Sequence, residues 1–177
     1  MPALVLITSP PGRGKTTALL RLAEALRADG LAVGGVWQRA MEGAGYRAGY
    51  DLVDLATGDT LPLARRRPTA DGPWGAFAFD ESAWSWAAAR IRTARLAADV
   101  MLVDEIGRLE AAGGGHLPAL REVLPGERAR TWVLAVRDLA LPAVLTTFGP
   151  PVAQVQAPVA EEEIGRLATA IGGYPVP

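Results

Sequence analysis

Cysteine and asparagine are both absent from this 177-residue chain, and lysine and histidine each occur only once. Without cysteine the chain can form no disulfide, no thiolate zinc site and no cysteine nucleophile. Without asparagine it cannot carry the Asn-Lys-x-Asp motif with which guanine-specific GTPases normally read their base. The net charge of −1 provides no basic surface for nucleic acid and no polybasic patch for a membrane. The remaining composition is that of an ordinary globular protein and predicts neither a nucleic acid nor a membrane as partner.

Long hydrophobic runs are missing as well. The apolar start, Met1–Ile7, has no basic leader and is far shorter than a bilayer-spanning helix. The chain length suits one domain with a sizeable core. We therefore predict a single domain over residues 1–177, cytoplasmic and monomeric, with no membrane segment.

The single lysine, Lys15, stands out because the other 17 of the 18 basic residues are arginine. It lies in the run Ser9–Thr16, which fits the pattern G-x-x-x-x-G-K-[ST] except that Ser9 takes the place of the first glycine. In this pattern backbone N–H groups converge on phosphate oxygens at a helix N-terminus. A compact ammonium also follows the β- and γ-phosphates better than a planar guanidinium does. To phosphate binding we assign Pro11, Gly12, Arg13, Gly14, Lys15, Thr16 and Thr17.

A second group of polar residues follows the apolar strand expected at 100–103. This strand would deliver Asp104 and Glu105 to the carboxyl edge of the sheet, beside the phosphate loop. Asp104 would hold Mg²⁺ through a water, with the Thr16 hydroxyl as a direct ligand, and Glu105 would polarise an attacking water. The alternative is that the two acids only cap a helix. Beside a phosphate loop, the pair favours hydrolysis of a nucleoside triphosphate.

Arg137 is the third catalytic candidate, with Lys15 and Glu105. It follows the strand expected at 131–136, where it could stabilise charge in the transition state. The alternative for Arg137 is a salt bridge to Asp138 or Glu105.

The periodicity of the chain predicts an α/β protein in which strands and helices alternate. Such alternation implies a mostly parallel sheet covered on both faces. Residues 45–65 alternate as in an inserted β-hairpin, and the arginine run 65–67 reads as an exposed loop. The expected strands are 4–8, 31–37, 77–79, 100–103, 131–136 and 152–156. The first expected helix begins at 15 and ends near 30, and the second runs to about 98 with Asp80 or Ser82 as its cap. The other expected helices span 117–124, 139–147 (interrupted by Pro142) and 160–171.

Three segments resemble the signatures of the cancer-related (THEP-type) nucleoside-triphosphatase family: Thr8–Thr17, Gly45–Tyr50 and Val103–Glu110. The resemblance implies a three-layer RecA-like P-loop NTPase fold with an additional strand between the two nucleotide motifs. It also implies slow, magnesium-dependent hydrolysis of the β–γ bond of ATP, GTP and other triphosphates with little base selectivity. The run Trp37–Met41 departs from the family pattern, and so does the absence of its C-terminal Asn-Arg pair. Both departures fit a divergent branch.

Two other functions stay open at this point. The chain could be a small-molecule phosphotransferase, or a nucleotide-dependent binding module in a cofactor pathway such as that of molybdenum. Arg39 and Arg47 are weaker site candidates, and Trp37 or Trp74 could stack on a base, although packing is the expectation for each tryptophan. The lone His116, after a glycine run, is expected to be a solvated or helix-start residue rather than a catalyst.

Overall fold

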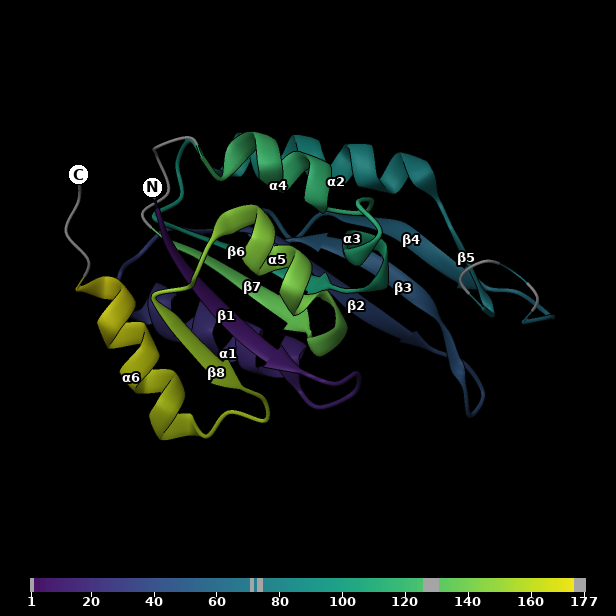
Figure 1. Ribbon diagram of the computed structural model, residues 1–177. Helices are drawn as coiled ribbons and strands as arrows, with labels where there is room; N and C mark the ends of the chain where they lie inside the picture. The colour runs from purple at the N-terminus through teal and green to yellow at the C-terminus, as the bar shows by residue number, and fades with distance from the viewer. Residues whose placement is uncertain (1, 71, 73–74, 126–130, 174–177) are drawn as a thin grey trace.

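The computed structural model describes residues 2–70, 72, 75–125 and 131–173, which form an eight-stranded sheet in the order β5-β4-β3-β2-β6-β7-β1-β8 (Figure 1). The strands are β1 (Ala3–Ser9), β2 (Val33–Glu42), β3 (Arg47–Asp54), β4 (Thr60–Arg66), β5 (Phe77–Phe79), β6 (Val100–Ile106), β7 (Thr131–Arg137) and β8 (Ala153–Gln156). The helices are α1 (Lys15–Ala28), α2 (Glu81–Ala94), α3 (Arg108–Ala111), α4 (Leu117–Val123), α5 (Leu141–Phe148) and α6 (Glu161–Gly172), with a 3₁₀ turn η1 (Asp138–Ala140).

The centre of the sheet is parallel. Strand β1 lies between β7 and β8, and β6 lies between β7 and β2, all in parallel register. The carboxyl ends of these strands therefore meet at one edge, where a ligand site is expected in such sheets. Parallel strands covered on both faces read as continuous apolar runs, and β1 and β7 have almost no exposed residue.

Helices cover the two faces of the sheet separately. Helices α1 and α6 pack on one face, and α2, α4 and α5 pack on the other (Figure 1). Each face has its own cluster of buried side chains, with Leu19 and Leu22 of α1 on the first and Trp132 of β7 on the second. The three-layer α/β architecture predicted from the sequence is confirmed.

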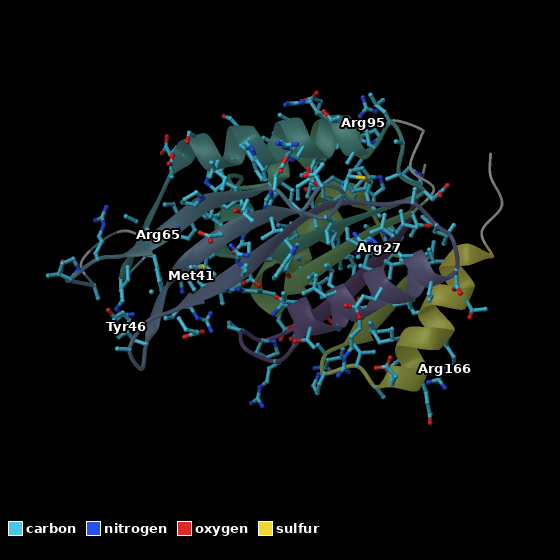
Figure 2. All side chains as sticks on the ribbon, turned by 180° about the vertical axis from the view of Figure 1, so that it is seen from behind. Arg27, Met41, Tyr46, Arg65, Arg95 and Arg166 are labelled. Atoms are coloured by element: carbon cyan, nitrogen blue, oxygen red, sulfur yellow. The ribbon has the colours of Figure 1, made fainter. Side chains whose placement is uncertain are left out.

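An antiparallel extension widens the sheet beyond β2. Strands β3 and β4 form the predicted hairpin, and β5 adds a further antiparallel strand at the edge. The prediction of an exposed loop over the arginine run was wrong for Arg65 and Arg66, which lie in β4. The Arg65 guanidinium pairs with Asp51 of β3 at 2.6 Å, which ties the charge run into the sheet. Figure 2 shows Arg65 on this extension, with Met41 near the end of β2 and Tyr46 between β2 and β3 beside it; this part of the sheet projects past α1.

Three other expectations needed correction. Strand β2 continues to Glu42 because β3 pairs with its second half. Pro142 does not interrupt a helix but stands in the first turn of α5, where its missing N–H leaves no hydrogen bond unmade. Helix α2 ends at Ala94 rather than near Ala98. Of the two expected caps, Asp80 is the one found, since it accepts a hydrogen bond from the Ser82 N–H.

Candidate active site

The loop between β1 and α1 has the backbone that phosphate binding requires. Gly12 and Gly14 have left-handed φ values of 72° and 86°. A Cβ at Gly12 would meet nothing within 4 Å, so the space over the loop is open to a ligand. Ser9 ends β1, and among the described residues Glu105 is the only one other than glycine with a positive φ. The loop therefore has no need of glycine at its first position.

Lys15 is the first residue of α1, and its side chain reaches back to this loop. Its ammonium donates hydrogen bonds to the carbonyl oxygens of Ser9 and Pro10, both at 3.0 Å, and the residue is only 4% exposed. Burial lowers the pKa of Lys15, while the charges of Glu105 and Asp104 act in the opposite direction. A buried ammonium held only by neutral carbonyls favours an anionic ligand, because a phosphate would compensate its lost hydration.

Asp104 lies near the end of β6 and is completely buried. Its Oδ2 accepts hydrogen bonds from the Thr16 hydroxyl at 2.8 Å and from the Gln38 N–H at 3.4 Å. Its Oδ1 has no hydrogen-bond partner within the described part of the chain. Burial, with the nearby charge of Glu105, raises the pKa of Asp104 to about 7.

Thr16 and Asp104 together fit a magnesium site. A buried carboxylate oxygen without a partner, next to a hydroxyl, supplies the hard oxygen donors that Mg²⁺ takes. No group of three or more acidic, histidine or cysteine side chains suited to a metal occurs among the described residues. Mg²⁺ typically binds through one or two protein oxygens together with substrate phosphates and water, so Thr16 and Asp104 suffice.

Glu105 adopts an unusual backbone conformation. Its φ is +67°, and the register between β6 and β7 shifts between Val103 and Ile106. A non-glycine residue held in this region costs on the order of 1–3 kcal/mol, and such residues cluster at active sites. Its carboxylate accepts a hydrogen bond from Nε of Arg137, the last residue of β7, and forms an ion pair with Nη2 of the same guanidinium. The ion pair considered from the sequence is thus present, with Glu105 rather than Asp138 as the partner.

A cavity of about 530 Å³ brings these groups together. Of the residues predicted for phosphate binding, Arg13 alone does not line it, and the Arg13 side chain points to solvent. The cavity is lined by Pro11, Gly12, Gly14, Lys15, Thr16, Thr17, Leu20, Trp37, Gln38, Ala40, Arg47, Tyr50, Asp104, Glu105 and Arg137. The phosphate loop and the acidic pair, which lie about half the chain apart, therefore face one space.

Comparisons with known proteins agree with this geometry. A family model described as NTPase matches residues 4–153. The nucleoside-triphosphatase THEP1 of Methanopyrus kandleri is 32% identical over 140 residues, which cover 78% of this chain and 76% of the relative. That of Thermococcus kodakarensis is 34% identical over 128 residues, covering 70% and 71%. The chain belongs to the THEP1-type NTPase family.

Two solved structures of nucleoside-triphosphatases share the fold of this chain over nearly its full length. A human cancer-related nucleoside triphosphatase superposes with a TM-score of 0.68 at 25% identity, over 97% of this chain and 96% of the other. THEP1 from Aquifex aeolicus, at 20% identity and a TM-score of 0.66, has the same fold. The RecA-like P-loop NTPase fold expected from the resemblance is confirmed. No helix in the described ranges is both long and apolar enough to cross a bilayer.

Sequence reasoning missed two residues of the site. Gln38 donates its N–H to Asp104, and its side chain lines the cavity just past the parallel part of β2. Glu110, only 3% exposed, accepts hydrogen bonds from the Gly107 N–H at 2.8 Å and the His116 N–H at 2.9 Å. Burial raises the pKa of this carboxyl group. Glu110 ends the segment Val103–Glu110 that resembles the family, so its position was available from the sequence, but its hydrogen bonds to two separate backbone segments were not.

The weaker candidates separate by location. Arg47 and Trp37 line the phosphate cavity, whereas Arg39 pairs with Asp51 at 3.1 Å, and Trp74 lies outside the described residues. His116 is the residue before α4, as one of the expected alternatives had it. It is not solvated: it is 2% exposed and edge-on to Trp84, with ring centroids 4.9 Å apart.

Proposed function

We propose that this protein hydrolyses the β–γ bond of ATP, GTP and other nucleoside triphosphates with Mg²⁺, and with little selectivity for the base. The observation that carries the proposal is the convergence of Lys15, the Thr16–Asp104 hydrogen bond and the Glu105 carboxylate on one cavity. Membership of a family named for this activity supports it.

The residues of the chain divide the work between binding and activation. The N–H groups of residues 12–17 and the Lys15 ammonium would surround the β- and γ-phosphates, as in other phosphate loops. Thr16 and Asp104 would hold Mg²⁺, which when bound neutralises charge on the triphosphate. Glu105 would accept a hydrogen bond from the attacking water and orient it toward the γ-phosphorus. Arg137 would move from Glu105 to the γ-phosphate as negative charge develops there.

Permissive base recognition follows from composition. The chain has no asparagine and so lacks the motif that confines guanine-specific proteins to GTP. Trp37 offers an aromatic face at the cavity, and stacking accepts every base. The cytoplasmic location and the monomeric state expected from the sequence stay predictions.

The test is phosphate release from ATP, GTP, CTP and UTP in the presence of Mg²⁺, compared with the Glu105→Gln protein. We expect turnover of all four by the unaltered protein. Turnover no faster than that of Glu105→Gln would contradict hydrolysis. Tight triphosphate binding with negligible turnover, and retention of a partner only with nucleotide, would instead favour a binding module in a cofactor pathway.

A further inference from the structure

A second cavity, which we call the aromatic chamber, adjoins the phosphate cavity. Its volume is about 240 Å³. It is lined by Gln38, Tyr50, Phe77, Phe79, Trp84, Glu105, Gly107, Arg108, Leu109, Glu110 and Arg137. The sequence has three Tyr, three Phe and five Trp, eleven in all, and four of these aromatic residues line this one space. None of these four belongs to the nucleotide motifs.

The antiparallel extension and helix α2 build the walls of the chamber. Tyr50 of β3 and Phe77 of β5 have ring centroids 5.4 Å apart. Phe79 of β5 stacks on Trp84 of α2, with ring centroids 6.1 Å apart and planes inclined by 20°. All four aromatic residues are only half-buried, so they present ring surface to the chamber as well as to the core.

The floor of the chamber is held by hydrogen bonds of a buried carboxylate. The buried Glu110 carboxylate accepts hydrogen bonds from the Gly107 N–H and the His116 N–H, and so joins the segment after β6 to the start of α4. Gly115 makes room for this contact, because a Cβ there would lie 1.9 Å from Glu110 Oε1. A site fixed in this way loses little entropy when it binds a ligand.

The chamber lies at the γ-phosphate end of the phosphate cavity. The two spaces share four lining residues, Gln38, Tyr50, Glu105 and Arg137. In phosphate loops of this pattern the lysine reaches the β- and γ-phosphates, while the second hydroxyl residue, Thr17, lies toward the α-phosphate. Beyond Glu105 there is thus no place for the nucleoside, only for a molecule that meets the terminal phosphate.

The chemistry of the walls limits what that molecule can be. Four aromatic rings favour a planar ring system, because stacking and edge contacts are made with aromatic partners. Gln38 and Arg108 also line the chamber and add residues with polar side chains to its walls. Drug-sized ligands occupy about 300–1,000 Å³, so about 240 Å³ suits a smaller molecule.

We propose that the aromatic chamber is an acceptor site, which takes a small planar aromatic molecule bearing a hydroxyl group and directs that hydroxyl to the γ-phosphate. The acceptor oxygen forms a bond to the γ-phosphorus while the bond from that phosphorus to the β–γ bridging oxygen breaks. The nucleoside diphosphate leaves with the electron pair of that bond, and the hydroxyl proton passes to the Glu105 carboxylate. Hydrolysis is the same reaction with water in place of the acceptor, so the inference rests on the proposed function.

The test follows the γ-phosphoryl group of γ-³²P-labelled ATP with Mg²⁺ and one of four probes: guanosine, thymidine, pyridoxine or 4-hydroxybenzyl alcohol. Xylitol is the non-aromatic control. We expect label on at least one aromatic probe and none on xylitol. Label on no probe while labelled phosphate is released would overturn the acceptor site and leave hydrolysis standing. No diphosphate formation at all would overturn both.

Variants then locate the site. Phe77→Leu and Trp84→Leu should each lower the ratio of labelled acceptor to labelled phosphate by about tenfold, since each removes a stacking surface. Trp86→Leu is the matched control, because Trp86 is half-buried on the same helix but lies under Arg90 outside the chamber. Its ratio should not change. Circular dichroism checks that each variant is folded, and an equal ratio in all three folded variants would overturn the assignment to the chamber.

Discussion

The carboxylate of Glu105 and the guanidinium of Arg137 form an ion pair at the boundary between the phosphate cavity and the aromatic chamber. Their side chains are 20% and 30% exposed, so the pair is partly screened by solvent. While Arg137 donates a hydrogen bond to Glu105, the Glu105 carboxylate is not free to accept one from a water, and the Arg137 guanidinium is not free to bind a phosphate. A triphosphate that draws Arg137 away would leave Glu105 free to act as a base, so binding and activation are coupled by this contact.

Replacing Glu105 by Gln should lower kcat for phosphate release by about 100-fold or more, because an amide cannot take the proton of the attacking water. Triphosphate binding should persist, since Lys15 and the loop N–H groups are untouched. Isothermal titration and phosphate release measure the two quantities separately. Glu24→Gln, at an exposed position on α1, is the matched control and should behave as the unaltered protein. Equal kcat values for the two variants would remove Glu105 from the mechanism.

Replacing Arg137 by Gln should lower kcat by about 10- to 100-fold with little change in KM, if its charge acts in the transition state. The free energy of unfolding should change by less than about 1 kcal/mol, because partly exposed ion pairs contribute little. Arg92→Gln is the matched control, since it breaks the exposed pair between Arg92 and Glu122 far from the cavity. A loss of stability without a loss of kcat would make Arg137 purely structural.

Replacing Gly35 by Ala should prevent folding or destabilise the protein by several kcal/mol. Gly35 has φ +117°, and a Cβ there would lie 1.8 Å from the carbonyl oxygen of Leu102 on β6. Gly58→Ala is the matched control, because Gly58 also has a positive φ, of +78°, but open space around it. We expect it to cost about 1–2 kcal/mol in urea denaturation. Similar losses in the two variants would show that backbone conformation alone, and not the contact with β6, requires Gly35.

The sequence places the run Ser9–Thr16 after a strand and Asp104 and Glu105 near the end of another, as the structure does, because each is a short contiguous motif attached to a strand. Both depend only on local geometry and on the carboxyl ends of parallel strands meeting. The aromatic chamber could not be predicted in the same way. Tyr50, Phe79 and Trp84 come from different elements, and only the strand order of the antiparallel extension brings them to Glu110. Burial of His116 likewise depends on Trp84, which is distant in sequence.

The buried His116 should make stability depend on pH in the acid range. Burial lowers the pKa of His116 to about 4, against about 6.5 in the unfolded chain. The unfolded state therefore binds the proton first, and stability should be lost as pH falls from 6.5 toward 4, by roughly 3 kcal/mol at most. His116→Phe keeps the ring contact with Trp84 and the N–H bond to Glu110 but cannot be protonated. The difference between the two urea-denaturation curves should vary over this pH range, and a constant difference would show that His116 does not titrate on unfolding.

Removal of Mg²⁺ should abolish phosphate release, and Asp104 should account for that dependence. With a chelator present, Asp104→Asn should be as stable as the unaltered protein or more stable, because one oxygen of the buried carboxylate has no hydrogen-bond partner among the described residues and burial opposes its ionisation. With Mg²⁺ and ADP the order should reverse, since ligand binding stabilises only the protein that can hold the ion well.

The Tm of the unaltered protein should rise on addition of both ligands, and that of Asp104→Asn should rise much less. Asp99→Asn, which changes an acid before β6 rather than at its end, is the control and should respond to Mg²⁺ as the unaltered protein does. An equal rise in Tm for Asp104→Asn and the unaltered protein would mean that Mg²⁺ is held by the nucleotide alone.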